Sequence, residues 1–282
     1  MSDVLDGVRA HYGATGLTER LKTALAVLGP EDQRLTPAQL APLDQFHTRG
    51  LAATAELAQL AGISADMSVL DVGAGVGGPA RFLAATHGCR VTGIDLSAPF
   101  VEAARYLTAR AGLSGQVSFE TGDALALPFG DGQFDVVLLQ HVAMNIADRA
   151  RLYDEIRRVL KPGGRFATFD VVLNDGAPHD RAPHFPLPWA RTPATSFLLS
   201  AAATRQAIEA DGFRVLASRD DTEAAKAWIA QQRAAGPPPS PNLGVVMGPE
   251  FAQLAGNLAR NLMEGRLGIL TAVFAAGSIV SR

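Results

Sequence analysis

Glycines are concentrated at residues 71–78, where an apolar segment gives way to a helical pattern and the sequence reads DVGAGVGG. Gly73, Gly75 and Gly78 fit the spacing G-x-G-x-x-G. Glycine permits a tight turn and the close approach of a ligand, and the N–H groups that begin the following helix favour an anion. The loop predicts a nucleotide-binding site. A plain structural turn is the alternative, because several families share this spacing.

Acidic residues follow the next two apolar segments. Asp95 ends the second segment, about twenty residues after the loop, where a carboxylate can accept hydrogen bonds from both hydroxyls of a ribose. Asp123 follows Gly122 after the third segment. Each has a structural alternative, since Asp95 could cap the helix that starts near Ser97 and Asp123 could be a turn residue. The loop and the acids together favour a nucleoside ligand more strongly than either does alone.

A histidine is the predicted catalytic residue. Gln140 and His141 directly follow the apolar segment 134–139, and open α/β sheets bind ligands at the carboxyl ends of their strands. An imidazole near its reference pKa can accept a proton from a hydroxyl or bind an amine. We predict that Asn145 contacts the substrate beside His141. The alternative for both side chains is that they hydrogen-bond the backbone and shape a pocket.

Three aromatic side chains are further predicted substrate contacts. Phe185 and Trp189 lie in the proline-rich segment 183–190, which is too apolar for an ordinary solvated loop. They could form a wall of the substrate site or only anchor a lid. Tyr12 precedes a leucine-patterned helix, where its hydroxyl could orient a substrate or anchor that helix.

The elements that must position these residues alternate between short apolar segments and helical patterns from residue 67 onward. This alternation is typical of repeated β-α-β units and a parallel sheet. The helix predicted over 147–160 has Asp148 as its cap and is ended by the Lys-Pro-Gly-Gly segment 161–164. The predicted strands are 68–72, 90–94, 117–120, 134–139, 165–172, 213–217 and the apolar run 268–280. The other helices predicted between them are 78–86, 97–111 and 202–210.

Two helical regions fall outside the alternation. Residues 1–50 are predicted to form an N-terminal helical lid, and Leu17, Leu21, Leu25 and Leu28 recur there at three- and four-residue spacing. Residues 222–266 are predicted to form a helical insertion on the substrate side, with helices at 222–235 and 249–264 around a rigid proline-rich loop at 236–244. The core domain is then 51–221 together with 267–282.

Composition excludes several classes of protein. The 282 residues are 48% hydrophobic and 19% charged, which indicates a folded chain, and the length suits one large domain or one domain with an appended lid. A net charge of −3 gives no basic field for nucleic acid. The apolar run 268–280 is too short to span a bilayer, and the N-terminus lacks the apolar core of a signal peptide, so we expect a cytoplasmic protein without a membrane partner.

The remaining metal-binding and thiol residue types predict no chemistry of their own. His179, Asp180 and His184 match no established metal-ligand spacing, so we predict no metal site. The single cysteine, Cys89, cannot form an internal disulfide and is expected to be a small core residue.

Five segments, taken in order, resemble the class I S-adenosylmethionine-dependent methyltransferases. Their order and spacing across residues 71–172 fit that family together, which makes the resemblance specific. They are DVGAGVG at 71–77, VTGIDLS at 91–97, GDA at 122–124, FDVV at 134–137 and RVLKPGGR at 158–165. The resemblance implies a Rossmann-like, doubly wound, mostly parallel α/β sheet with an antiparallel last strand.

The resemblance also implies that S-adenosylmethionine is the cofactor. Gly73 and Gly75 would pass beneath its methionine and ribose, and Asp95 would hold the ribose hydroxyls. Asp123 would bond the adenine amino group. Arg49 could pair with the methionine carboxylate or be a surface arginine. The implied cofactor-binding residues are Gln45, Arg49, Asp71, Gly73, Ala74, Gly75, Asp95, Leu96, Gly122, Asp123, Ala124 and Gln140.

The predicted function is methyl transfer from S-adenosylmethionine to a nitrogen or oxygen nucleophile of a small molecule, by in-line displacement assisted by His141. The resemblance is closest to the sarcosine and dimethylglycine, phosphoethanolamine and tocopherol methyltransferases, and a homodimer is the assembly to test. Two alternatives stay open: an NAD-type oxidoreductase that would use the same loop and ribose acid, and a catalytically silent module that binds S-adenosylmethionine.

Overall fold

A single mixed sheet positions the predicted site. The computed structural model describes residues 16–176, 182–236 and 240–277. The strands lie in the order β3-β2-β1-β4-β5-β7-β6, with β7 antiparallel to both of its neighbours and β1 to β5 paired in parallel. The strands are β1 (Ser68–Val72), β2 (Arg90–Asp95), β3 (Val117–Thr121), β4 (Phe134–Gln140), β5 (Leu160–Leu173), β6 (Phe213–Asp220) and β7 (Leu267–Ala276).

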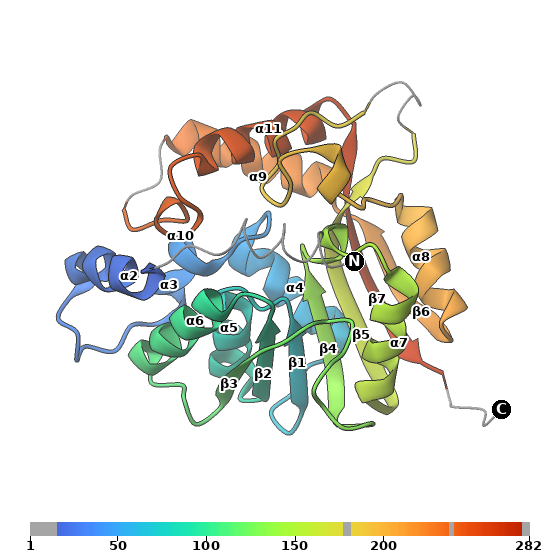
Figure 1. Ribbon diagram of the computed structural model, residues 1–282, viewed down its shortest axis with the longest axis horizontal. Coiled ribbons are helices and arrows are strands. Elements are labelled where there is room, and N and C mark those ends of the chain that lie inside the picture. Colours follow the sequence, from blue (N-terminus) through green and yellow to red (C-terminus); the bar gives the residue numbers. More distant parts are fainter. Residues whose placement is uncertain (1–15, 177–181, 237–239, 278–282) are drawn as a thin grey trace.

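Helices cover both faces of this sheet, because successive strand residues point to opposite sides and both sides are apolar. Val69 belongs to the core beneath one helical layer, whereas Leu70 belongs to the core beneath the other. The first layer contains α4 (Gly50–Ala61), α5 (Gly78–His87) and α6 (Ala98–Ala111); the second contains α7 (Arg149–Val159) and α8 (Ala201–Ala210), as Figure 1 shows.

The carboxyl ends of β1 to β4 meet at one edge of the sheet because these strands run in the same direction. Asp71 on β1 lies opposite Gly93 on β2 and Leu138 on β4. Asp95 on β2 lies opposite Thr121 on β3. The loops that carry the predicted ligand-binding residues therefore leave the sheet next to one another.

A further helical layer lies over this edge (Figure 1). It combines segments from the N-terminal region and from residues 222–266, and Leu17, Leu21 and Leu25 pack there in a core with Leu40 of α3. The predicted leucine spacing therefore marks a buried helix face. The helices of this layer are α2 (Leu17–Leu25), α3 (Pro37–Asp44), α9 (Thr222–Ala235), α10 (Gly244–Met247) and α11 (Phe251–Met263), and short turns of 3-10 helix occur at Ala26–Leu28, Ala143–Asn145 and Pro193–Thr195.

The predicted fold class is confirmed, with adjustments at particular ends. Asp148 caps α7 by accepting from the Arg151 N–H, as expected. β5 starts earlier than predicted, since Leu160 already pairs with Phe134. The short helix α10, which was not predicted, begins at Gly244, the last residue of the predicted proline-rich loop. No helix among the described residues is long and apolar enough to cross a membrane.

Candidate active site

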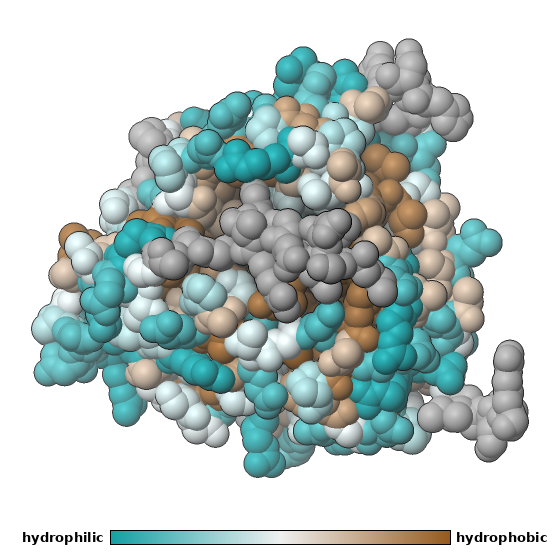
Figure 2. Space-filling model, in the orientation of Figure 1, coloured by the Kyte–Doolittle hydropathy of each residue, from teal (hydrophilic) through white to brown (hydrophobic). Residues whose placement is uncertain are grey.

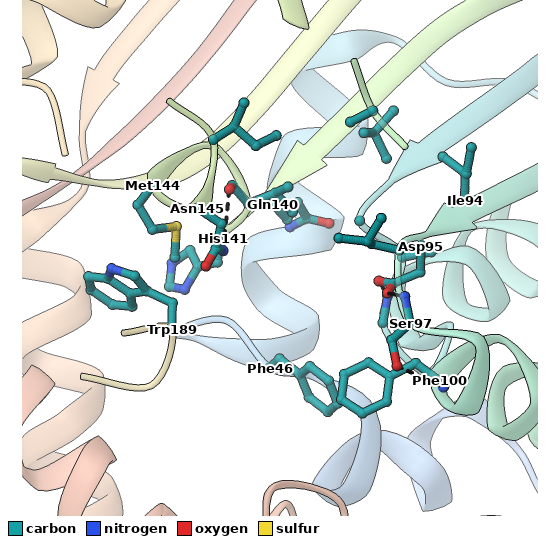
Figure 3. Close-up of a pocket in the computed structure, with 18 of the residues that line it drawn as sticks. Phe46, Ile94, Asp95, Ser97, Phe100, Gln140, His141, Met144, Asn145 and Trp189 are labelled. Carbon is teal, nitrogen blue, oxygen red and sulfur yellow. Dashed lines mark hydrogen bonds between the residues drawn. The ribbon is translucent and has the colours of Figure 1, made fainter. Parts of the chain in front are cut away.

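A cavity of about 410 Å³ lies between the carboxyl edge of the sheet and the helices above it. This volume falls in the range of small-molecule sites. The loops after β1 to β4 form one side. Asp44, Phe46 and His47, the segment after β5, and α10 with α11 form the other. The predicted residues that line it are Asp71, Gly73, Ala74, Gly75, Asp95, Leu96, Gly122, Asp123, Ala124, Gln140, His141, Asn145 and Trp189, several of which Figure 3 shows.

Hydrogen bonds to β2 hold the glycine loop in place. The N–H groups of Gly73 and Ala74 both donate to the Ile94 carbonyl, at 2.8 and 3.0 Å. The Gly75 N–H donates to the Asp95 carboxylate at 2.8 Å. A Cβ on Gly73, whose φ is +73°, would lie 2.4 Å from Val142, so an alanine there would be strained and would also clash. The loop is thereby kept close to other residues of the cavity wall.

Two carboxylates stand in the wall beside this loop. Asp71 is 2% exposed, and its Oδ2 has no hydrogen-bond partner among the described residues. Burial, with a smaller effect from the charge of Asp95, raises the pKa of Asp71 to about 7. Burial also raises the pKa of Asp95, although hydrogen bonds from Ser97 and Gly75 oppose the rise. A buried, unpaired carboxylate oxygen is suited to a cationic group of a ligand.

The structural alternatives for Asp95 and Asp123 are each partly realised. Ser97 caps α6 by accepting from the Phe100 N–H, while Asp95 accepts from the Ser97 N–H at 2.9 Å. Asp123 forms a turn by accepting from the Leu125 N–H at 2.9 Å. Both carboxylates nevertheless line the cavity, so these local bonds orient them without removing them from it.

His141 has a backbone conformation that differs from that of the strand it follows. Its φ is +54°, which is uncommon for a residue other than glycine. Its N–H donates to the Phe169 carbonyl at 2.9 Å, and its ring stacks on the Phe169 ring with centroids 5.4 Å apart. Burial, together with the nearby His47, lowers the pKa of His141 well below 6.5, so the imidazole is uncharged at neutral pH. The expectation of an imidazole near its reference pKa is therefore corrected.

Sequence reasoning gave no individual role to several polar side chains of the cavity region, among them His47 and Thr54. His47 lines the cavity, and burial lowers its pKa to about 4. Its Nε2 lies 3.0 Å from the Gly50 carbonyl and 3.0 Å from Thr54 Oγ1. Thr54 Oγ1 in turn contacts Gln140 at 3.4 Å. Both residues lie in the N-terminal segment rather than after a strand, so their position relative to the sheet gave no signal.

Apolar side chains form the cavity wall around His141 and Asn145. Trp189 is buried and donates from Nε1 to Ser196 Oγ at 3.0 Å, which fixes its ring against the cavity. Figure 3 shows Met144 and Trp189 beside His141. On the face shown in Figure 2, hydrophobic side chains are visible at the left and right ends of the band between the upper helices and the sheet layer. The other apolar residues of this wall are Pro188, Phe197, Met247, Phe251 and Leu258.

Some predicted site residues do not line the cavity. Arg49 instead pairs with Glu56 and lies 3.6 Å from Asp221, and Gln45 donates to Asp44 at 3.1 Å. Phe185 packs partly buried against the core. Tyr12, His179 and Asp180 lie outside the described residues, and His184 pairs with Glu264 at 2.8 Å.

Comparison with known proteins identifies the domain that carries the site. Residues 70–168 match the family model described as a methyltransferase domain. The sterol 24-C-methyltransferase erg-4 of Neurospora crassa is 39% identical over 128 residues, which are 45% of this chain and 34% of that protein. The matched regions cover between 31% and 51% of the curated relatives' own lengths, so the likeness concerns this domain.

Solved structures share the fold over nearly the whole chain. The geranyl diphosphate C-methyltransferase from Streptomyces coelicolor A3(2) has a TM-score of 0.67 at 18% identity, covering 96% of this chain and 97% of that one. The 4+2 cyclase SpnF has a TM-score of 0.65 at 24% identity, covering 93% and 92%. At these identities the likeness establishes the fold and leaves the chemistry to the site itself.

Proposed function

Because residues 70–168 belong to the class I S-adenosylmethionine-dependent methyltransferases, we propose that the protein transfers a methyl group from S-adenosylmethionine to a small-molecule acceptor. One observation carries the proposal: a single cavity has the glycine loop and its carboxylates at one end and an uncharged histidine within an apolar wall at the other. Such a cavity can hold a nucleoside donor and an acceptor in line.

The glycine-loop end of the cavity fits the cofactor. Gly73 lets the loop pack directly against Val142 in the cavity wall, where a Cβ would lie 2.4 Å from that side chain. Asp95 would hold the ribose hydroxyls, and the unpaired oxygen of Asp71 would attract the ammonium of the methionine group. Asp123, with Leu96 and Ala124, would bind the adenine. When bound, the cofactor supplies an electrophilic methyl group, which leaves alignment and proton handling to the protein.

The other end of the cavity favours an acceptor with an apolar body. Trp189, Phe197 and Phe251 offer aromatic surface, and the two histidines that face this end are uncharged at neutral pH because burial lowers their pKa. We therefore propose a neutral acceptor in which one hydroxyl or amine reaches His141. A zwitterion such as sarcosine would lose its hydration without gaining an opposite charge from these side chains.

Methylation of matched neutral and charged acceptors tests this function. The protein would be incubated with S-adenosylmethionine carrying a ¹³C-methyl group and with phenols, aromatic amines, sarcosine or phosphoethanolamine. We expect methyl transfer to the neutral apolar compounds, and NMR of the product then identifies the atom that received the methyl. Transfer confined to sarcosine or phosphoethanolamine would contradict the acceptor class.

Replacement of His141 tests its role separately. His141→Asn removes the imidazole but keeps a residue that tolerates positive φ. We expect turnover of the accepted compound to fall by about 100-fold, the lower end of general acid–base effects, with unchanged affinity for S-adenosylhomocysteine. An unaltered rate would mean that His141 only shapes the pocket. His87→Asn, outside the cavity, is the matched control.

The two alternatives make different predictions. An oxidoreductase would bind NADH and ignore S-adenosylhomocysteine, and the methyltransferase-domain match argues against it. A silent module would bind S-adenosylhomocysteine yet transfer no methyl to any acceptor of the panel. A cytoplasmic location and a homodimer remain sequence-based predictions, which cell fractionation and gel filtration would test.

A further inference from the structure

The hydrogen-bond directions around His47 are fixed by a carbonyl group. His47 Nε2 lies 3.0 Å from the Gly50 carbonyl oxygen, which can only accept, so Nε2 carries a hydrogen. Because that nitrogen then has no free lone pair, it also acts as the donor toward Thr54 Oγ1 at 3.0 Å. The residue is buried and its lowered pKa keeps the ring neutral, so the contact with the carbonyl selects a single tautomer.

The hydroxyl hydrogen of Thr54 is thereby left for Gln140. Thr54 Oγ1 donates to Gln140 Oε1 at 3.4 Å. A reversed amide would turn its NH₂ toward Thr54 and leave the hydroxyl hydrogen without an acceptor among the described residues. The amide oxygen of Gln140 is therefore directed to Thr54, and its nitrogen is left over.

That nitrogen is a buried donor without a partner. Gln140 is 8% exposed, and its Nε2 forms no hydrogen bond within the described part of the chain. The residue lines the cavity, and Figure 3 shows it between Asp95 on one side and His141 on the other. Buried N–H groups in native proteins nearly always have an acceptor, so this donor calls for one from a ligand.

We propose that His47 and Thr54 are positioning residues that turn the Gln140 amide toward the carboxylate of the cofactor's methionine group, an inference that rests on the proposed function. An amino acid group carries an ammonium and a carboxylate on one carbon. Asp71 on β1 has an unpaired acceptor, and Gln140 on the adjacent strand β4 has an unpaired donor. The two together match the two charges of that group.

The hydrogen bonds that run from His47 through Thr54 to Gln140 form a relay, and calorimetry with two ligands tests it. S-adenosylhomocysteine has the amino acid group, whereas 5′-methylthioadenosine keeps the adenosine and the sulfur but lacks it. Thr54→Val breaks the chain, and we expect it to weaken S-adenosylhomocysteine binding by about tenfold, as for one lost hydrogen bond to a charged group. The affinity for 5′-methylthioadenosine should stay within about twofold, since no contact of the relay reaches that ligand.

Matched variants separate orientation from packing. Thr54→Ser keeps the hydroxyl and should retain wild-type affinity. Thr92→Val makes the same substitution on β2 outside the cavity and should change neither ligand's binding. His47→Phe should reproduce the selective loss, and the double variant with Thr54→Val should lose no more than either single one, because both break the same chain.

Several results would overturn the proposal. Equal losses for both ligands in Thr54→Val would mean that the threonine only supports the cavity wall, and no loss for either would mean that the relay has no effect on binding. Additive losses in the double variant would show that His47 and Thr54 act independently. If the wild type bound neither nucleoside, the proposed function itself would fail, which is distinct from a failure of the relay alone. Should His47→Phe fail to fold, the comparison of Thr54→Val with Thr54→Ser still tests the proposal.

Discussion

At the scale of single residues, burial sets the charge of the side chains around the cavity. It lowers the pKa of His47 to about 4 and raises that of Asp71 to about 7. His47 is therefore uncharged at neutral pH, whereas Asp71 is near its midpoint and would be driven to ionise by a cationic ligand. The polar groups can thus hydrogen-bond an uncharged acceptor at one end of the cavity and attract an ammonium at the other.

These shifts predict opposite pH effects on folding stability. The folded pKa of His47 lies below its ordinary value of 6.5, so the unfolded chain binds the proton more readily and stability is lost as the pH falls from about 6.5 to 4. Relative to wild type, His47→Phe should therefore gain about 3 kcal/mol in free energy of unfolding between pH 7 and pH 4. Urea unfolding at the two pH values measures the difference.

Asp71 is predicted to change folding stability with pH in the direction opposite to His47, so it serves as a control. Its folded pKa lies above the ordinary 3.8, so the folded carboxyl retains a proton that the unfolded chain releases, and this stabilisation is lost as the pH rises toward 7. Asp71→Asn should become less stable relative to wild type on acidification. Parallel pH curves for wild type and both variants would contradict the assigned shifts.

The sequence predicted the residues that follow strands better than those that do not. Asp71, Asp95 and Gln140 come directly before or at a strand end, and parallel pairing alone brings strand ends to one edge. His47 comes from a segment outside the alternation, and its place depends on how that segment packs against β5, where its ring contacts Phe169. The position of Arg49 also depends on the packing of that segment. Its charge suited a ligand carboxylate, but in the structure it pairs with the Glu56 carboxylate.

At the scale of elements, the turn after β1 depends on backbone that only glycine adopts without strain. Gly73→Ala would combine a φ of +73° with a Cβ 2.4 Å from Val142. We expect loss of S-adenosylhomocysteine binding and a lower melting temperature. Gly163→Ala has a similar φ of +76° but nothing within 4 Å, so it isolates backbone strain, at about 1 kcal/mol. Equal effects of both substitutions would show that the close approach at Gly73 does not matter.

The elements themselves were largely predictable because local rules act on each of them. Short apolar segments and helical patterns located β1 to β4 and α5 to α8, and Asp148 marked the start of α7. The short helix α10 was not predicted, because four residues with two valines carry too little pattern. Its position depends on packing against α2 and α3, which no local signal reports.

At the scale of the whole molecule, one group of charges joins three regions that are distant in sequence. Arg49 directly precedes α4, and Glu56 lies within that helix. Arg219 and Asp221 lie at the junction of β6 and α9. Arg219 contacts Glu56 at 2.5 Å and Asp221 at 2.6 Å, and Thr271 of β7 also donates to Asp221. This group ties the segment that carries His47 to the start of the helices over the cavity.

The sequence predicted that Arg49 contacts the ligand, whereas in the structure Arg49 belongs to this group of charges. Its side chain is 12% exposed, so Arg49→Gln would leave Asp221 and Glu56 short of a buried positive charge. Because Glu56 is partly exposed and Arg219 remains, we expect a loss of about 2 kcal/mol in free energy of unfolding, below the usual cost of breaking a fully buried pair.

The comparison of stability with binding decides between the two roles of Arg49. In the folded variant, the affinity for S-adenosylhomocysteine should change by less than about threefold, since the guanidinium does not line the cavity. Thermal unfolding and calorimetry on the same preparation give both quantities. A large loss of affinity at unchanged stability would instead assign Arg49 to the cofactor carboxylate and would leave Gln140 without its proposed partner, because the relay and the arginine compete for the same group of the ligand.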